Sequence, residues 1–263
     1  MTPAPRKPGP DVDDAAADHF LGLPGAHTVA TETLLLTRDN LADCIDAKAM
    51  ACIHGDAGLG KTLSVNASLR ELLTPDRVCR VQFRARPTPR DIRHTLFDAL
   101  AVGGTPPRKP IEFDLLLKDV LSERFRILVC DEAQWMSREC FEYWRHLWDD
   151  RRTDIAIVFV GGGDCYRVLS REPMLSSRVY VWQEFRRMNT EQVLRVIPAF
   201  HPVWEGVDAD TITFADVHAG HGNFRNWAKL TAHTVQALNK LDRAGVDREV
   251  LGWVFAKLSG RSG

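Results

Sequence analysis

The 263-residue chain lacks several features that mark secreted, membrane-spanning or strongly basic proteins. It has no apolar run near the roughly 18 residues that a membrane-spanning helix needs, and no secretory signal peptide. Its six cysteines form no C-x-x-C pair, which favours buried free thiols in a reducing compartment over disulfides or zinc ligands. A net charge of −1 gives no general attraction to nucleic acid, so any such contact needs a local patch. We therefore expect a cytoplasmic protein with no membrane partner.

One short stretch matches a phosphate-binding template at every fixed position. The template G-x-x-x-x-G-K-[ST] is filled by Gly55, Asp56, Ala57, Gly58, Leu59, Gly60, Lys61 and Thr62. Its glycines let backbone N–H groups turn toward an anion, its lysine reaches the β- and γ-phosphates, and its threonine hydroxyl ligates Mg²⁺. An apolar run precedes it at 50–54, and apolar residues follow at helical spacing from Thr62 to Leu73. This context favours a nucleotide site over an ordinary glycine-rich turn.

A second stretch places two carboxylates at the end of a strand. The apolar run 125–130 is followed directly by Asp131 and Glu132. Ligands bind at the carboxyl ends of buried parallel strands, so Asp131 is placed to hold Mg²⁺ and Glu132 to polarise an attacking water. By itself this pair would be interpreted as a solvated acidic turn. Following a phosphate-binding loop, it predicts hydrolysis of ATP or GTP.

Strand and helix patterns alternate as far as residue 185, and only helical patterns follow. The expected strands lie at 50–54, 78–83, 125–130, 155–160 and 179–182. The alternation predicts an α/β fold with a mostly parallel sheet and helices on both faces. We expect a disordered proline-rich tail at 1–26, a phosphate-loop core at 27–186 and a small helical domain at 187–263.

Two helical details are also predicted. A helix capped near Thr37 is expected to run through Ala47. In the helical pattern after Met136, an aromatic stripe between Cys140 and Trp148 is expected to pack against the sheet, with a partner surface as the alternative.

Arginine is concentrated between residues 80 and 93, where five arginines accompany a single acid, Asp91. Four of them are candidates for contacts with the phosphates of duplex DNA: Arg84, Arg86, Arg90 and Arg93. Salt bridges between subunits are the alternative use of these arginines. Phosphate contacts carry no sequence information, so such a patch would hold DNA without choosing a sequence.

The order of these motifs along the chain resembles the AAA+ ATPases. By that resemblance Arg178, which precedes the fifth strand, looks like the arginine finger donated to a neighbouring subunit's ATP, with Arg171 as the alternative. Arg225 looks like the second sensor, which closes a helical lid onto the phosphates. An isolated arginine at either place would otherwise be interpreted as part of a surface salt bridge. One departure is the run Gly161–Gly163 at the end of strand four, where that family often has an asparagine or threonine as its first sensor.

Within the AAA+ ATPases, the short sequences at 131–134 and 222–225 look most like those of the transposition-regulator branch. That branch includes TniB-, TnsC- and MuB-like ATPases and is close to the secretion ATPase ExeA. The resemblance implies ATP and Mg²⁺ as cofactors, a homo-oligomeric ring or filament on duplex DNA, and a transposase or other recombination protein as partner. The implied catalytic residues are Lys61, Glu132, Arg178 and Arg225. An ExeA-like secretion ATPase and a replication helicase loader or initiator are the alternative functions.

Overall fold

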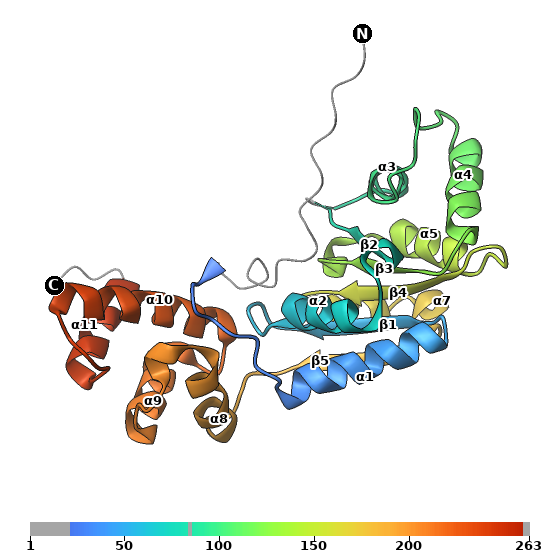
Figure 1. The fold of residues 1–263 in the computed structure, drawn as a ribbon. Coiled ribbons are helices and arrows are strands. Elements are labelled where there is room, and N and C mark those ends of the chain that lie inside the picture. The colour runs from blue at the N-terminus through green and yellow to red at the C-terminus, as the bar shows by residue number, and fades with distance from the viewer. Residues whose placement is uncertain (1–21, 84–85, 260–263) are drawn as a thin grey trace, which may run out of the picture.

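A five-stranded sheet forms the centre of the molecule, shown in Figure 1 as a computed structural model that describes residues 22–83 and 86–259. The strands are β1 (Met50–Gly55), β2 (Val78–Val81), β3 (Arg126–Cys130), β4 (Ile155–Val160) and β5 (Val179–Phe185). They lie in the order β2-β3-β4-β1-β5, and every neighbouring pair is parallel. The expected parallel α/β sheet is confirmed. Of the tail expected at 1–26, residues 1–21 lie outside the described part of the chain.

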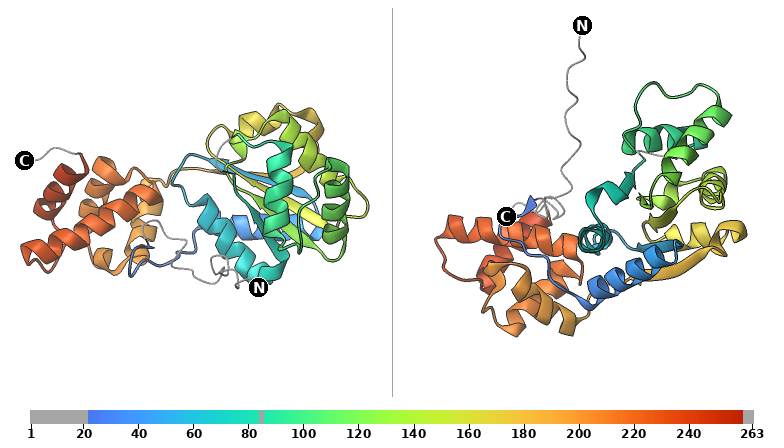
Figure 2. Two further views of the ribbon diagram at one scale, coloured as in Figure 1. Left: turned by 90° about the horizontal axis from the view of Figure 1, so that it is seen from above. Right: turned by 45° about the vertical axis from the view of Figure 1, so that its right-hand side comes forward.

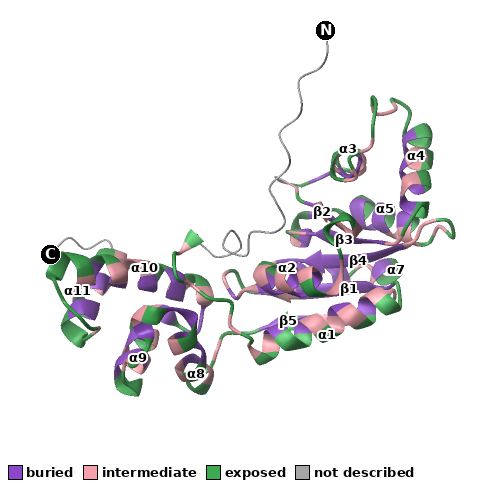
Figure 3. Cartoon of the chain, viewed as in Figure 1, coloured by how far each residue is buried: buried purple, intermediate pink, exposed green. Residues whose placement is uncertain are grey.

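Both faces of the sheet are buried. On one face, Met50 and Cys52 of β1 belong to a core that is covered by helices from α3 to α7. On the other face, Ala51 and Ile53 pack against α1 and α2. The helices are α1 (Glu32–Asp46), α2 (Lys61–Leu72), α3 (Pro89–Ala99), α4 (Pro110–Ser122), α5 (Arg138–Trp148), α6 (Cys165–Ser170) and α7 (Pro173–Ser176). Figure 3 shows the buried strands between helices that are exposed on their outer sides. Burial on both faces explains why these strands are nearly continuous apolar runs.

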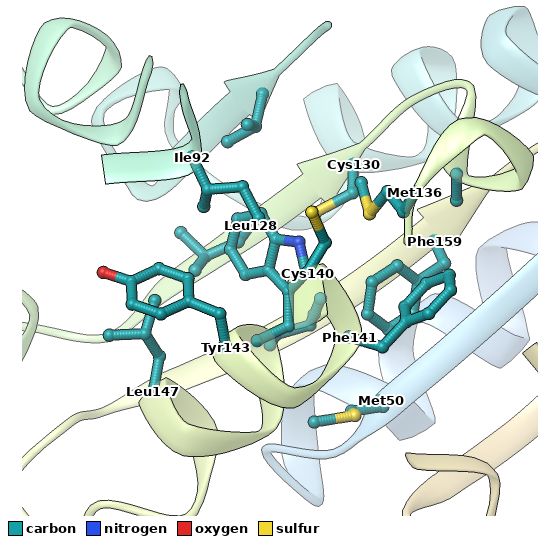
Figure 4. Packing of buried hydrophobic residues seen from close by; sticks show 14 of the residues in the cluster. Met50, Ile92, Leu128, Cys130, Met136, Cys140, Phe141, Tyr143, Leu147 and Phe159 are labelled. Carbon is teal, nitrogen blue, oxygen red and sulfur yellow. The ribbon is translucent and has the colours of Figure 1, made fainter. Parts of the chain in front are cut away.

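The aromatic stripe of α5 packs into this core, as Figure 4 shows. Phe141 and Trp144 are fully buried, and the Phe141 ring meets Phe159 of β4 edge-on with 6.0 Å between centroids. Trp148 lies partly buried at the margin, and its indole N–H donates to the carbonyl of Lys48. The packing interpretation of the stripe is therefore confirmed.

All six cysteines are free and buried. Burial raises the pKa of Cys44 and of Cys79 to about 12, so these thiols stay protonated at neutral pH. The expectation of buried free thiols is confirmed for the whole set.

Helix α1 begins earlier than its sequence pattern suggested. Its N-cap is Thr31, whose hydroxyl oxygen accepts a hydrogen bond from the N–H of Leu34. Thr37, expected at the cap, lies inside the helix and donates its hydroxyl to the carbonyl of Thr33. The expectation was wrong because three consecutive leucines at 34–36 hide the helical period in this stretch.

The C-terminal region is entirely helical among its described residues and has a core of its own (Figure 2). Its helices are α8 (Thr190–Phe200), α9 (Ala209–Ala215), α10 (Phe224–Leu241) and α11 (Arg248–Leu258). Trp204 and Trp227 meet edge-on with 5.1 Å between centroids, and their indole N–H groups donate to Thr231 and Asp216. Pro198 lies within α8, which continues to Phe200. Within 22–83 and 86–259, no helix combines the length and apolar character needed to cross a bilayer.

Candidate nucleotide-binding site

The phosphate-binding template forms the turn between β1 and α2. Gly55 has φ +139°, and a Cβ there would lie only 2.3 Å from the carbonyl oxygen of Phe185. Gly58 has φ +82°, and a Cβ there would lie 2.5 Å from Oδ1 of Asn223. Both positions therefore require glycine for backbone conformation and for space. The turn ends at Gly60, the N-cap of α2, where the unpaired N–H groups of the helix favour an anion.

Lys61 opens α2 and is 9% exposed. Its ammonium donates hydrogen bonds of 2.8 Å to the carbonyl oxygens of both Gly55 and Asp56. Burial lowers the pKa of Lys61, and the nearby carboxylates of Asp131 and Glu132 act in the opposite direction. The side chain thus folds back over the template and places its positive charge next to the turn.

Asp131 directly follows β3, and β4 lies between β3 and the strand β1 that precedes the template. Its Oδ2 accepts a 3.2 Å hydrogen bond from the hydroxyl of Thr62, and its Oδ1 accepts one of 2.8 Å from the N–H of Glu132. Burial raises the pKa of Asp131, and the adjacent charge of Glu132 adds to the effect. The structure therefore brings the expected pair of magnesium ligands, Thr62 and Asp131, into direct contact.

Glu132 follows in the left-handed region of backbone conformation, with φ +55°. It is the N-cap of a short 3-10 turn, η3 (Ala133–Trp135). Its carboxylate accepts a short hydrogen bond from the amide Nε2 of Gln134. Non-glycine residues seldom adopt this conformation, so the backbone here is held by its surroundings.

These residues line one cavity of about 380 Å³, within the size range of small-molecule sites. Its walls come from the template, both carboxylates, the end of β4, the start of α10 and α8. Residues 27–29 and 31–34, before and within α1, also line the cavity. None of the site residues predicted from the sequence lies in this stretch.

The helical region contacts the template through the first turn of α10. The N–H of Arg225 donates to the carbonyl of Gly58 at 3.0 Å, and Nδ2 of Asn223 donates to the carbonyl of Ala57 at 2.9 Å. Oδ1 of Asn223 also caps α10 by accepting from the N–H groups of Arg225 and Asn226. Arg225 thus lines the cavity as the resemblance suggested. The contact made by Asn223 was not foreseen from the sequence.

Arg178 and Arg171 lie away from this cavity. Arg178 precedes β5, whose first residue pairs with Met50 at the start of β1, whereas the template follows the end of β1. Its guanidinium makes a two-pronged ion pair with Asp149, at 2.7 and 3.0 Å. Arg171 lines a smaller cavity of about 140 Å³ between α5 and α7. Neither arginine reaches the template of its own chain.

The arginine-rich segment divides into residues with different surroundings. Arg86 and Arg90 are exposed, between the end of β2 and the start of α3, and Arg84 lies outside the described residues. Arg93 instead binds Asp114 of α4 through Nε at 2.7 Å and Nη2 at 3.0 Å. Its side chain is only 16% exposed and lies over the ring of Tyr143. The charge of Arg93 is thus paired within the fold, which leaves Arg86 and Arg90 as the exposed arginines of the predicted patch among the described residues.

Comparison with known proteins identifies the fold. A family model described as an AAA domain matches residues 45–169. No curated protein sequence matches the chain. Together with the sheet order and the helical C-terminal region, these comparisons show a P-loop AAA+ fold.

Solved structures of similar fold include a Cdc6p, an ORC1 protein and a branch migration motor. Cdc6p from Pyrobaculum aerophilum is 17% identical with a TM-score of 0.68, over 85% of this chain and 66% of that chain. The ORC1 protein of Aeropyrum pernix, solved in complex with DNA, is 18% identical with a TM-score of 0.65, over 90% and 67%. The Thermotoga maritima RuvB Holliday junction branch migration motor is 14% identical with a TM-score of 0.59, over 85% and 68%. At these identities the likeness concerns the fold, and this chain spans about two thirds of each of those chains.

Proposed function

We propose that this chain binds ATP with Mg²⁺ in the cavity between its sheet and its helical region, and hydrolyses the γ-phosphate. The observation that carries the proposal is the convergence of Lys61, Asp131, Glu132 and Arg225 on one cavity. These residues come from three separate segments of the chain, so their meeting is a property of the fold. A loop, a cation, two carboxylates and an arginine are the groups that phosphoryl transfer to water requires.

Each group has a distinct role in the proposed reaction. The template and the N-terminus of α2 bind the phosphates, and the ammonium of Lys61 and the guanidinium of Arg225 balance their negative charge. Glu132 accepts a proton from water while the water oxygen bonds to the γ-phosphorus. The bond from that phosphorus to the bridging oxygen of the β-phosphate breaks, which gives ADP and inorganic phosphate.

The residues fit a magnesium ion. Thr62 supplies a hydroxyl oxygen, and Asp131 supplies a carboxylate oxygen 3.2 Å away. Mg²⁺ is usually held by only one or two protein oxygens, with water and phosphate completing its shell. Bound there, the ion would supply positive charge to the β- and γ-phosphate oxygens as the bond breaks.

The catalytic assignment is tested by two substitutions in the full chain and one control. Lys61→Ala should lose ATP binding, because it removes the cation beside the template. Glu132→Gln should still bind ATP and hydrolyse it at least ~100-fold more slowly, the scale expected for a lost general base. Glu249→Gln, which alters an exposed glutamate of α11, is the matched control and should turn over normally. Equal turnover in wild type and Glu132→Gln would refute the role of Glu132.

We further propose that ATP-bound subunits assemble on duplex DNA as a ring or filament that regulates transposition with a transposase or other recombination protein. This proposal is supported by the short sequences at 131–134 and 222–225 and by the exposure of Arg86 and Arg90. Arg84 joins them by its position in the sequence. Arg178 lies at the opposite edge of the sheet from its own template and would complete the site of the next subunit by exchanging its ion pair with Asp149 for that subunit's phosphate.

A replication initiator or helicase loader is the second candidate, favoured by the structural likeness to Cdc6p and ORC1. The two functions differ in what should stimulate ATP hydrolysis. A transposition regulator that binds through phosphates should respond to duplex DNA of any sequence. An initiator or loader should prefer particular DNA sequences or respond to a helicase. Turnover assays with random duplexes, followed by electron microscopy with an ATP analogue, separate them.

A further inference from the structure

One side chain, Gln134, connects the loop after β3 with the loop after β4. Its Oε1 accepts a hydrogen bond of 2.8 Å from the N–H of Gly162, and its Nε2 donates to the carboxylate of Glu132. The N–H of Gly162 requires an acceptor, so the amide oxygen must face it and the NH₂ group must face Glu132. The orientation of the amide is therefore set by chemistry. Gln134 and its two hydrogen-bond partners, Glu132 and Gly162, all line the nucleotide cavity.

The glycine run after β4 makes room for this side chain. A Cβ on Gly161 would lie 2.6 Å from Oε1 of Gln134 and 2.5 Å from Sγ of Cys165. A Cβ on Gly162 would lie 3.5 Å from Nε2 of the same glutamine. Space, and not an unusual φ, is what excludes a side chain at Gly161. A polar group from the turn after the neighbouring strand β3 thus lies at the end of β4, where the glycine run supplies no polar side chain.

We infer that Gln134 is a positioning residue for hydrolysis, which holds the carboxylate of Glu132 in place for the attacking water. The inference rests on the proposed ATPase function. The backbone of Glu132 is in the left-handed region, and its carboxylate is hydrogen-bonded to Gln134, which in turn binds Gly162 in the loop after β4. A general base must lie within hydrogen-bond reach of the water that it deprotonates, and a displacement of about 1 Å can cost about 100-fold in rate.

Two near-isosteric substitutions separate positioning from simple structural support. Gln134→Glu keeps an acceptor for the N–H of Gly162 but removes the donor to Glu132. Gln134→Met removes both hydrogen bonds and adds no charge. If Gln134 positions Glu132, kcat should fall by about 10- to 100-fold in both variants, while KM for ATP stays within about threefold. If its role were only to support Gly162, Gln134→Glu would turn over like wild type and Gln134→Met alone would be impaired.

Controls for folding and for coupling complete the experiment. Affinity for ADP, which has no γ-phosphate, and melting temperature should match wild type in both variants. A double variant that combines Glu132→Gln with Gln134→Met should hydrolyse ATP, in single-turnover assays, no more than about twofold more slowly than Glu132→Gln alone. Trp135→Ala, at the exposed neighbouring position, is the matched control for disturbance of η3.

The outcomes also distinguish this inference from the proposed function. Normal turnover in Glu132→Gln would refute the proposed catalytic site itself. Slow turnover in Glu132→Gln with wild-type kcat in either Gln134 variant would overturn only the positioning role. Additive losses in the double variant would likewise overturn it, because Gln134 would then act independently of Glu132.

Discussion

The pairing of Arg93 leads to a prediction that separates structural arginines from DNA-contacting ones. Arg93 of α3, Asp114 of α4 and Tyr143 of α5 form one polar cluster, in which the tyrosine hydroxyl donates to Asp114 at 2.8 Å. The side chains of the ion pair are 16% and 18% exposed. Arg93→Met keeps an apolar stem but leaves the carboxylate of Asp114 buried without its cation.

The expected cost of Arg93→Met follows from that burial. Removing one partner of a fully buried pair costs about 3–5 kcal/mol, so the lower end, about 3 kcal/mol, suits a pair with this exposure. For a chain of this size that loss corresponds to a fall of about 6–12 °C in melting temperature. Arg90→Met, an exposed arginine on the same helix, is the matched control and should change stability by less than about 0.5 kcal/mol.

For DNA binding, Arg90→Met should have the larger effect of the two substitutions. Arg90→Met should flatten the slope of log affinity against log salt by about 0.9 on duplex DNA, while Arg93→Met leaves it unchanged below its melting temperature. An Arg93→Met variant with normal melting and a flattened slope would refute the structural assignment and return Arg93 to the DNA surface.

The stability loss should also depend on pH. Burial raises the pKa of Asp114, but hydrogen bonds from Arg93 and Tyr143 outweigh it and hold that pKa below its ordinary value. A depressed pKa stabilises the fold fully above the unfolded value of about 3.9, and this contribution is lost as pH falls below it. The gap in stability between wild type and Arg93→Met should therefore be at its full size from neutral pH down to about pH 4 and should narrow as pH falls further. A gap that widens on acidification would contradict the ion pair as its source.

Three further predictions concern the site. Arg178→Ala should bind nucleotide normally but lose hydrolysis. Mixing it with Lys61→Ala protein should restore some turnover, because one mixed interface combines an intact phosphate-binding loop with an intact Arg178. No recovery of turnover at any mixing ratio would argue against a site shared between subunits. Asn223→Ala should cost about 1 kcal/mol in a melting assay through the lost cap of α10, and should weaken nucleotide affinity through the lost contact with Ala57; unchanged values would remove Asn223 from the site. Chelation with EDTA should stop hydrolysis and added Mg²⁺ should restore it, whereas turnover in EDTA would exclude a cation between Thr62 and Asp131.

The sequence could locate those parts of the site that lie within short contiguous motifs. The spacing from Gly55 to Thr62 specifies a turn between a strand and a helix, and the apolar run before Asp131 specifies a strand end. Parallel pairing then brings such strand ends to one edge of the sheet. The close approach of Thr62 and Asp131 needs no further information than these local patterns and the sheet.

Side chains whose partners are distant in the chain could not be assigned in this way. Gln134 and Gly162 are separated by 28 positions, and Asn223 and Ala57 by 166. For Arg93, a count of local charge missed Asp114, which lies on the next helix, 21 positions away. A local charge count measures how many arginines a segment has, but only the packing of α3 against α4 and α5 decides which remain exposed.

The contacts around Gly58 link the template to the helical region directly. The carbonyl oxygens of Ala57 and Gly58 accept hydrogen bonds from Asn223 and Arg225, respectively. A side chain at Gly58 would collide with both of these residues. Asn223 uses its other amide atom to cap α10, so the same side chain joins the turn to the helix. Any change in the backbone at 57–58 when phosphate binds therefore alters hydrogen bonds at the first turn of α10. We therefore expect phosphate binding to affect the first turn of α10 through Asn223 and Arg225.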